Sequence, residues 1–234
     1  MIRVQKNCKH KLFNSSRMLI KVCGVKLDED LAAIASAGVD FVGLIFYPAS
    51  ARYAGGSIDK NLVELLAKTY PNLKRVGVFV NADREDVLIN AESYHLNTLQ
   101  FHGEETPEYC AQFKDRFSII KALAIETEED FGACEKYEGI CDYFLFDTSG
   151  PLPGGNGYGW DWSLLSAYNG DTPFLLSGGI GPADILKICA IRHPRLTGID
   201  INSKFEKIPG VKNCEAIKSF VRIIKAGEYE IYGE

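Results

Sequence analysis

Short apolar runs recur along this chain at intervals of roughly 20 to 30 residues, and segments with a helical pattern separate them. Eight runs are strand candidates: Leu19–Val22, Phe41–Phe46, Arg75–Val80, Thr98–Phe101, Ser118–Leu123, Tyr143–Phe146, Phe174–Leu176 and Thr197–Ile199. Because the runs are apolar throughout, they are typical of parallel strands that helices cover on the outside. The pattern therefore predicts an α/β protein built from repeated βα units.

Several of the segments between these runs carry apolar residues at helical spacing. They are Leu27, Leu31 and Ile34 in the first segment, Ile185, Ile188 and Cys189 in the seventh, and Ile217, Phe220, Val221 and Ile224 in the last. Gly38 stands where the first helix should end. Eight βα units with right-handed crossovers can close into a ring, so we predict a single (β/α)₈ TIM barrel. An open doubly wound sheet is the alternative.

The length of the chain fits one domain. A chain of 234 residues, 46% of them hydrophobic, can bury one sizeable core. No Ser/Pro-rich or single-charge stretch divides it. Residues 1–17 are basic, precede the first apolar run and show no core-facing pattern. We therefore predict a barrel domain over residues 18–234 and a poorly ordered leader over residues 1–17.

Charge and cysteine usage exclude several classes of partner. A net charge of -5 offers no uniform basic surface for nucleic acid. No apolar run approaches the roughly 18 residues of a membrane span, and the start lacks the apolar segment of a secretory signal. The seven cysteines form no CxxC pair, which argues against disulfides and a zinc site. We predict a cytoplasmic protein without a bound metal.

In a barrel of this kind the active site lies at the carboxyl ends of the strands, and two ionisable side chains stand at such ends. Cys23 ends the first strand candidate and Asp147 ends the sixth. These strands are three apart around the ring, so the two groups should face each other across the mouth. A thiolate can remove a proton and a carboxylic acid can deliver one. An inert buried cysteine, and an N-cap or ion-pair role for Asp147, are the alternatives.

Two segments are candidates for a phosphate site. Ser177-Gly178-Gly179 and Asp200-Ile201-Asn202-Ser203 follow the seventh and eighth strands, whose loops frequently bind phosphate in this barrel. Glycines let backbone N–H groups approach the phosphate oxygens, and Pro182 opens a helix directly afterwards. Plain tight turns are the alternative. The glycine-rich stretch 154–159 does not fit GxGxxG, and we expect it to form a mobile lid.

Arg52, in the loop after the second strand, is a candidate for a bidentate clamp on a carboxylate. A solvated surface arginine is the alternative. His102 ends the fourth strand and could bond a ligand or satisfy the barrel rim, so its position alone assigns it no catalytic role.

The ordered motifs at the strand ends resemble the phosphoribosylanthranilate isomerase family of tryptophan biosynthesis. The resemblance rests on Ile20–Gly24, Phe41–Phe46 with Ser50–Tyr53, Val76–Asn81, Leu99–Glu104, Phe146–Thr148 with Gly154–Gly157, Asp161-Trp162, Leu176–Ile180 and Gly198–Gly210. It covers residues 19 to about 225 and leaves out the leader.

The resemblance implies a cofactor-free Amadori rearrangement of a phosphorylated small molecule, N-(5-phosphoribosyl)anthranilate. It assigns the general base to Cys23 and the general acid to Asp147. It also implies that Arg52 holds the anthranilate carboxylate and that Asp200 is an acidic position at the substrate. The phosphate would lie at Ser177, Gly178, Gly179, Asn202 and Ser203. The chain departs from the family pattern at Asn202-Ser203-Lys204, where a small Ser-Ser-Gly-like turn is usual, and at Ala51, where proline is frequent.

Three other functions compete with this prediction. The indole-forming synthase of the same pathway relies on strand-end lysine and glutamate groups, whereas Lys121 lies inside the fifth strand and no matching glutamate is present. The second is a catalytically inactive binding barrel, and the joint presence of Cys23, Asp147 and Arg52 argues against it. The third is a thiol redox protein, and the lack of a second cysteine near Cys23 argues against it. Because this fold occurs in monomers and dimers, we expect either a monomer or a homodimer.

Overall fold

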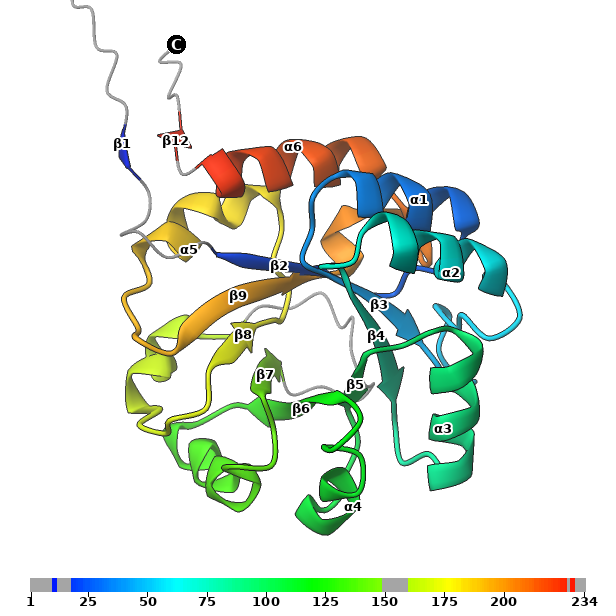
Figure 1. Cartoon of the computed structure of the whole chain (residues 1–234). Helices are drawn as coiled ribbons and strands as arrows, with labels where there is room; N and C mark the ends of the chain where they lie inside the picture. Colours follow the sequence, from blue (N-terminus) through cyan, green and yellow to red (C-terminus); the bar gives the residue numbers. More distant parts are fainter. Residues whose placement is uncertain (1–9, 12–17, 149–159, 227, 230–234) are drawn as a thin grey trace, which may run out of the picture.

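The computed structural model describes residues 10–11, 18–148, 160–226 and 228–229. Eight parallel strands close into a barrel in which the ring order follows the sequence (Figure 1). They are β2 (Leu19–Val22), β3 (Phe41–Ile45), β4 (Lys74–Phe79), β5 (Thr98–Phe101), β6 (Ser118–Ile125), β7 (Tyr143–Thr148), β8 (Phe174–Leu176) and β9 (Leu196–Ile201). The ring closes where β2 pairs with β9, with Leu19 opposite Gly198. The closed ring confirms the TIM barrel and excludes the open doubly wound sheet.

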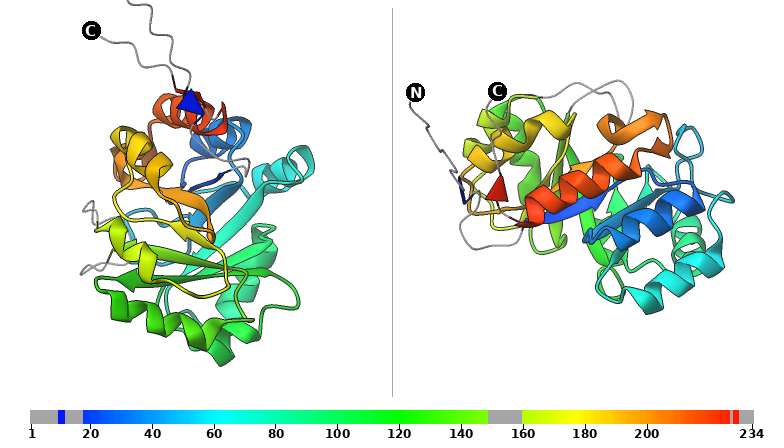
Figure 2. Two further views of the ribbon diagram at one scale, coloured as in Figure 1. Left: turned by 90° about the vertical axis from the view of Figure 1, so that its left-hand side faces the viewer. Right: turned by 90° about the horizontal axis from the view of Figure 1, so that it is seen from above.

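Helices surround the barrel on its outside, as the turned views in Figure 2 show. They are α1 (Asp28–Ser36), α2 (Lys60–Thr69), α3 (Arg84–Ser93), α4 (Pro107–Ala111), η1 (Glu128–Tyr137), η2 (Trp162–Ala167), η3 (Pro182–Asp184), α5 (Ile185–Ala190), η4 (Ser203–Phe205) and α6 (Cys214–Ala226). The η segments are 3₁₀ helices, so the connections after β6 and β7 are tighter than α-helices.

The predicted strand bounds were right for β2, β5 and β8 and shifted by one or two residues elsewhere. Two of these shifts affect the site. Strand β7 continues through Asp147, which is opposite Ala124 of β6, and β9 continues through Asp200, which is opposite Lys21. Both carboxylates therefore lie within strands, where ladder hydrogen bonds hold their backbones.

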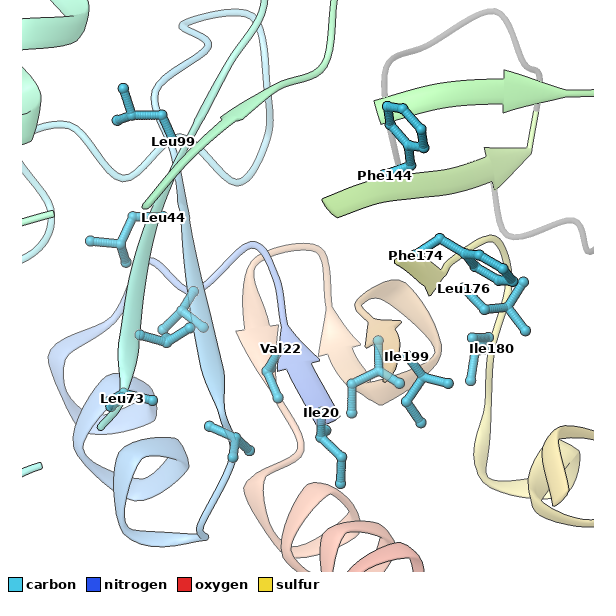
Figure 3. Close-up of a cluster of buried hydrophobic side chains, with 14 of the residues drawn as sticks. Ile20, Val22, Leu44, Leu73, Leu99, Phe144, Phe174, Leu176, Ile180 and Ile199 are labelled. Atoms are coloured by element: carbon cyan, nitrogen blue, oxygen red, sulfur yellow. The ribbon is translucent and has the colours of Figure 1, made fainter. Parts of the chain in front are cut away.

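Two apolar layers stabilise the barrel. One fills the space between strands and helices, and Figure 3 shows Ile20, Val22 and Ile199 in it. The other lies inside the ring; it consists of Cys23, Phe41, Val76, Val78, Ile120, Ala122, Leu145 and Leu175. Alternate residues of each strand enter opposite layers, as the two-residue period of a strand requires. Residues 21, 23 and 200 thereby point into the ring.

Two short antiparallel strand pairs add to the barrel. Strand β10 (Glu206–Ile208) pairs with β11 (Val211–Lys212). Strand β1 (His10–Lys11) pairs with β12 (Glu228–Tyr229), so part of the leader meets the other end of the chain. The rest of the expected leader, and the expected lid at 154–159, lie outside the described residues.

In the described part of the chain, no helix combines the length and apolar character needed to cross a membrane. The six cysteines of this part are free thiols.

Candidate active site

A cavity opens at the carboxyl ends of the barrel strands. It is lined by eight of the nine residues predicted for the site: Cys23, Asp147, Ser177, Gly178, Gly179, Asp200, Asn202 and Ser203. The ninth, Arg52, is not among the described residues that line it. Gln100, His102 and Thr148 also line the cavity. The fold thus brings together side chains from seven segments that are far apart in the sequence.

Cys23 follows β2 directly, and its backbone N–H donates to the Ile201 carbonyl at 3.0 Å. Its side chain is 5% exposed. Burial raises the pKa of the Cys23 thiol, and the positive charges of Lys21 and Lys212 oppose that rise while Asp200 adds to it. The neutral thiol is therefore the favoured form near neutral pH.

Asp147 is a buried carboxyl group with specific partners. Its Oδ1 accepts a hydrogen bond from the Thr148 backbone N–H at 2.8 Å, and its Oδ2 lies 3.5 Å from Nε2 of His102. Burial raises the pKa of Asp147 against the opposing effect of that backbone hydrogen bond. A raised carboxyl pKa favours the protonated form, which is the form a general acid needs.

His102 joins Asp147 to a second buried side chain. The Nε2 atom of Gln100 lies 2.8 Å from Nδ1 of His102. Burial lowers the pKa of His102 to about 4, so the ring is neutral near neutral pH. His102 therefore lies between the Gln100 amide and the Asp147 carboxyl group.

Lys21 is a site residue that the sequence reasoning missed. Its side chain is fully buried inside the barrel, with Nζ 3.0 Å from Oδ2 of Asp200. Burial lowers the pKa of Lys21, but the electrostatic and hydrogen-bond interactions with Asp200 and Cys23 outweigh burial and leave it raised. The other Asp200 oxygen, Oδ1, is buried without a partner among the described residues. That oxygen is available to a ligand in the cavity.

The predicted phosphate loops lie next to each other at the mouth. Gly178 and Gly179 have φ angles of 92° and 68° after β8. Residues other than glycine rarely adopt this left-handed backbone conformation. A Cβ atom at Gly178 would also come within 2.8 Å of Thr148 and Trp160 side-chain atoms. On the neighbouring strand end, the Asn202 Oδ1 accepts from Lys212 Nζ at 2.7 Å.

Arg52 lies in the loop after β3 and pairs with Glu206 of β10. Its Nε and Nη2 atoms donate to the two carboxylate oxygens at 2.9 and 2.7 Å. Glu206 therefore holds the Arg52 guanidinium group in place, and the Arg52 side chain is only 13% exposed. A solvated surface arginine does not describe it.

Comparisons with known proteins find one family of isomerases that is similar to this chain. A family model described as N-(5'phosphoribosyl)anthranilate (PRA) isomerase matches residues 20–223. The curated N-(5'-phosphoribosyl)anthranilate isomerase of Parabacteroides distasonis is 44% identical over 210 residues, which is 88% of this chain and 93% of the relative. The enzyme of that name from Phocaeicola vulgatus is 42% identical, over 89% of this chain and 98% of the relative.

Solved structures give the same picture. Phosphoribosyl anthranilate isomerase from Thermotoga maritima is similar with a TM-score of 0.73 and 32% identity, over 89% of this chain and 99% of that chain. Another solved isomerase, 30% identical with a TM-score of 0.70 over the same shares, is in complex with reduced 1-(o-carboxyphenylamino)-1-deoxyribulose 5-phosphate.

Proposed function

The chain belongs to the N-(5'-phosphoribosyl)anthranilate isomerase family, and we propose that it converts N-(5'-phosphoribosyl)anthranilate to 1-(2-carboxyphenylamino)-1-deoxyribulose 5-phosphate in tryptophan biosynthesis. The reaction is an Amadori rearrangement, which moves protons within one molecule. The observation that carries the proposal is the cavity that Cys23 and Asp147 line together from β2 and β7, three strands apart in the closed ring.

Asp147 acts first, as the general acid. Its carboxyl group protonates the ribose ring oxygen, the C1'–O bond breaks, and the anilino nitrogen supplies the electron pair that forms an iminium ion. Burial of Asp147 supports this role because it holds the proton on the carboxyl group to higher pH.

Cys23 acts second, as the general base. Burial raises the pKa of its thiol, but the iminium cation formed beside it favours the thiolate. The thiolate removes the C2' proton, and the enolamine that results tautomerises to the ketone. The Cys23 thiol gives one proton to solvent as the thiolate forms and regains one from C2', and the Asp147 carboxylate takes one proton from solvent, so the overall reaction neither consumes nor releases protons.

The remaining site residues bind the substrate. Ser177–Gly179 and the pair Asn202-Ser203 hold the phosphate, and the left-handed backbone at Gly178 and Gly179 supports close approach of its oxygens. Asp200 offers its free Oδ1 to the sugar. Arg52 binds the anthranilate carboxylate.

Lys121 argues against the indole-forming synthase as the function. Its Nζ donates to the Gly103 carbonyl at 2.6 Å and pairs with Glu105 at 3.1 Å. This pair is buried, and neither residue is among the described residues that line the cavity. Lys121 therefore has a structural role in the packing of the barrel.

We further propose that the chain works in the cytoplasm, without nucleic acid or membrane, as a monomer or homodimer. One solved structure of a relative, from Thermotoga maritima, is of monomers generated from a dimeric isomerase. Sedimentation equilibrium of this chain decides between the two states.

The test of the function is a fluorescence assay. Freshly made phosphoribosylanthranilate loses its fluorescence as it isomerises, so purified protein should accelerate that loss in proportion to its concentration. No acceleration at micromolar protein would overturn the proposal.

A further inference from the structure

Glu206 occupies only one edge of the Arg52 guanidinium group. Nε donates to Oε1 at 2.9 Å and to Oε2 at 3.2 Å, and Nη2 donates to Oε2 at 2.7 Å. A guanidinium group has five N–H donors in one plane. No described residue accepts a hydrogen bond from the edge formed by Nη1 and the second N–H of Nη2, and a carboxylate fits such an edge with two parallel hydrogen bonds.

Glu206 is itself held rigidly. Its side chain is 3% exposed, and its Oε1 accepts from Lys212 Nζ at 2.9 Å and from the Gly210 N–H at 3.2 Å. Lys212 is fully buried and also donates to Asn202 at the cavity wall. Strands β10 and β11 place Glu206 directly opposite Lys212. The carboxylate therefore cannot turn away from Arg52 without breaking its contacts with Lys212 and the Gly210 N–H.

The cluster borders the proposed active site and keeps one positive charge. Arg52 and Lys212 carry two positive charges and Glu206 carries one negative charge. The aliphatic part of Arg52 lies against Gly24, where a Cβ atom would come within 2.7 Å of Arg52 Cδ and 2.9 Å of Asn202 Oδ1. Gly24 directly follows Cys23, and Cys23 and Asn202 both line the cavity, so the aliphatic part of Arg52 lies beside the cavity wall.

We propose that Glu206 is a positioning residue: it turns the Nη1–Nη2 edge of Arg52 toward the cavity and so makes it a bidentate clamp for the substrate carboxylate. This inference rests on the proposed function, which assigns the carboxylate to Arg52. A competing role would have Glu206 occupy Arg52 until the substrate displaces it. The buried contacts with Lys212 and Gly210 favour positioning, because the free edge lets a carboxylate bind without breaking them.

Calorimetry on the full chain separates these roles. The probes are reduced 1-(o-carboxyphenylamino)-1-deoxyribulose 5-phosphate and its counterpart without the ring carboxyl group. Glu206→Gln should weaken binding of the carboxylated probe about tenfold and leave the other probe within about twofold, because only the carboxylate meets the clamp. The double variant Glu206→Gln/Arg52→Ala should bind no more weakly than Arg52→Ala, since Glu206 acts through Arg52.

Asp171→Asn is the matched control, because it also converts an arginine-paired carboxylate to an amide, but at an exposed pair with Arg195. It should leave both affinities unchanged. If Glu206→Gln does not fold, Glu206→Asp is the second variant. It should give a smaller loss of affinity that is again confined to the carboxylated probe. Tighter binding of the carboxylated probe, or equal loss for both probes, would overturn the inference. If the proposed function itself is wrong, the unaltered chain will show no turnover, and this result is separate from the binding measurements.

Discussion

Lys21 and Asp200 form an ion pair inside the barrel, with Nζ 3.0 Å from Oδ2 and with both side chains buried. The pair lies on neighbouring strands, since Lys21 of β2 is opposite Asp200 of β9. Cys23 points into the same interior two residues after Lys21. The charge state of the proposed base is thus tied to a buried pair.

Lys21→Met should raise the pKa of the Cys23 thiol further, because it removes the cation that opposes burial. Asp200→Asn should act in the opposite direction. The measurement is the pH dependence of iodoacetamide labelling of the Cys23 peptide by mass spectrometry. Lys21→Met should also lower the free energy of unfolding by about 3–5 kcal/mol, since it leaves a buried carboxylate unpaired. Equal labelling profiles for the two variants would contradict this account.

Asp147→Asn should stabilise the folded chain at alkaline pH relative to acid pH. Burial raises the pKa of Asp147 in the folded state, so the folded chain holds this proton more tightly than the unfolded chain. Below the ordinary carboxyl pKa of about 3.9 the group is neutral in both states. As pH rises through the folded pKa, the wild type must bury a charge and loses stability, whereas the asparagine variant does not.

Thermal unfolding of both proteins at about pH 4 and about pH 8 checks this, since each kcal/mol shifts Tm by about 2–4 °C in a chain of this size. The Tm advantage of Asp147→Asn should grow with pH. An advantage that is equal at both pH values would show that burial does not perturb this carboxyl group.

Inorganic phosphate should protect the amides of 177–179 and 202–204 from hydrogen exchange. Residues 177–179 and 202–203 line one cavity from neighbouring strands, and a bound anion suppresses local opening. Exchange measured with and without phosphate reports the change, and chloride at equal ionic strength is the control. Protection confined to other loops would show that phosphate binds elsewhere in the protein.

A chain that begins at Met18 should fold and turn over normally. Strand β2 begins at Leu19, and Lys225 of α6 donates to the Met18 carbonyl at 3.2 Å, so the barrel closes within the retained residues. The pairing of β1 with β12 would be lost. Circular dichroism and kcat should match those of the full chain within about twofold. If the shortened chain is insoluble or inactive, residues 1–17 are needed for folding or for activity.

The barrel and most of the site were predictable because they depend on local patterns. Apolar runs separated by helical segments specify βα units, and the rule that barrel sites lie at strand ends selects Cys23, Asp147 and the loops after β8 and β9. One signal for Lys21 was present: a charge inside an apolar run, two residues before Cys23, must share its face of the strand.

The network around Arg52 could not be predicted in the same way. Glu206 and Lys212 lie in a short hairpin without apolar periodicity, and Glu206 is 154 residues from Arg52 in the sequence. Only the closed ring brings the loop after β3 next to the segment after β9. Position alone therefore left a clamp and a surface arginine equally open for Arg52.

The central claim is that Cys23 is the base and Asp147 the acid, and the pH dependence of kcat in single variants tests it most directly. Cys23→Ser and Asp147→Asn should each lower kcat by a factor on the order of 10² to 10⁴, with substrate binding retained. The wild-type profile should be bell-shaped. Residual activity of Asp147→Asn should only rise with pH, because the remaining thiol must lose its proton, and that of Cys23→Ser should only fall. Near wild-type kcat in Cys23→Ser, under conditions where chemistry limits turnover, would contradict the account.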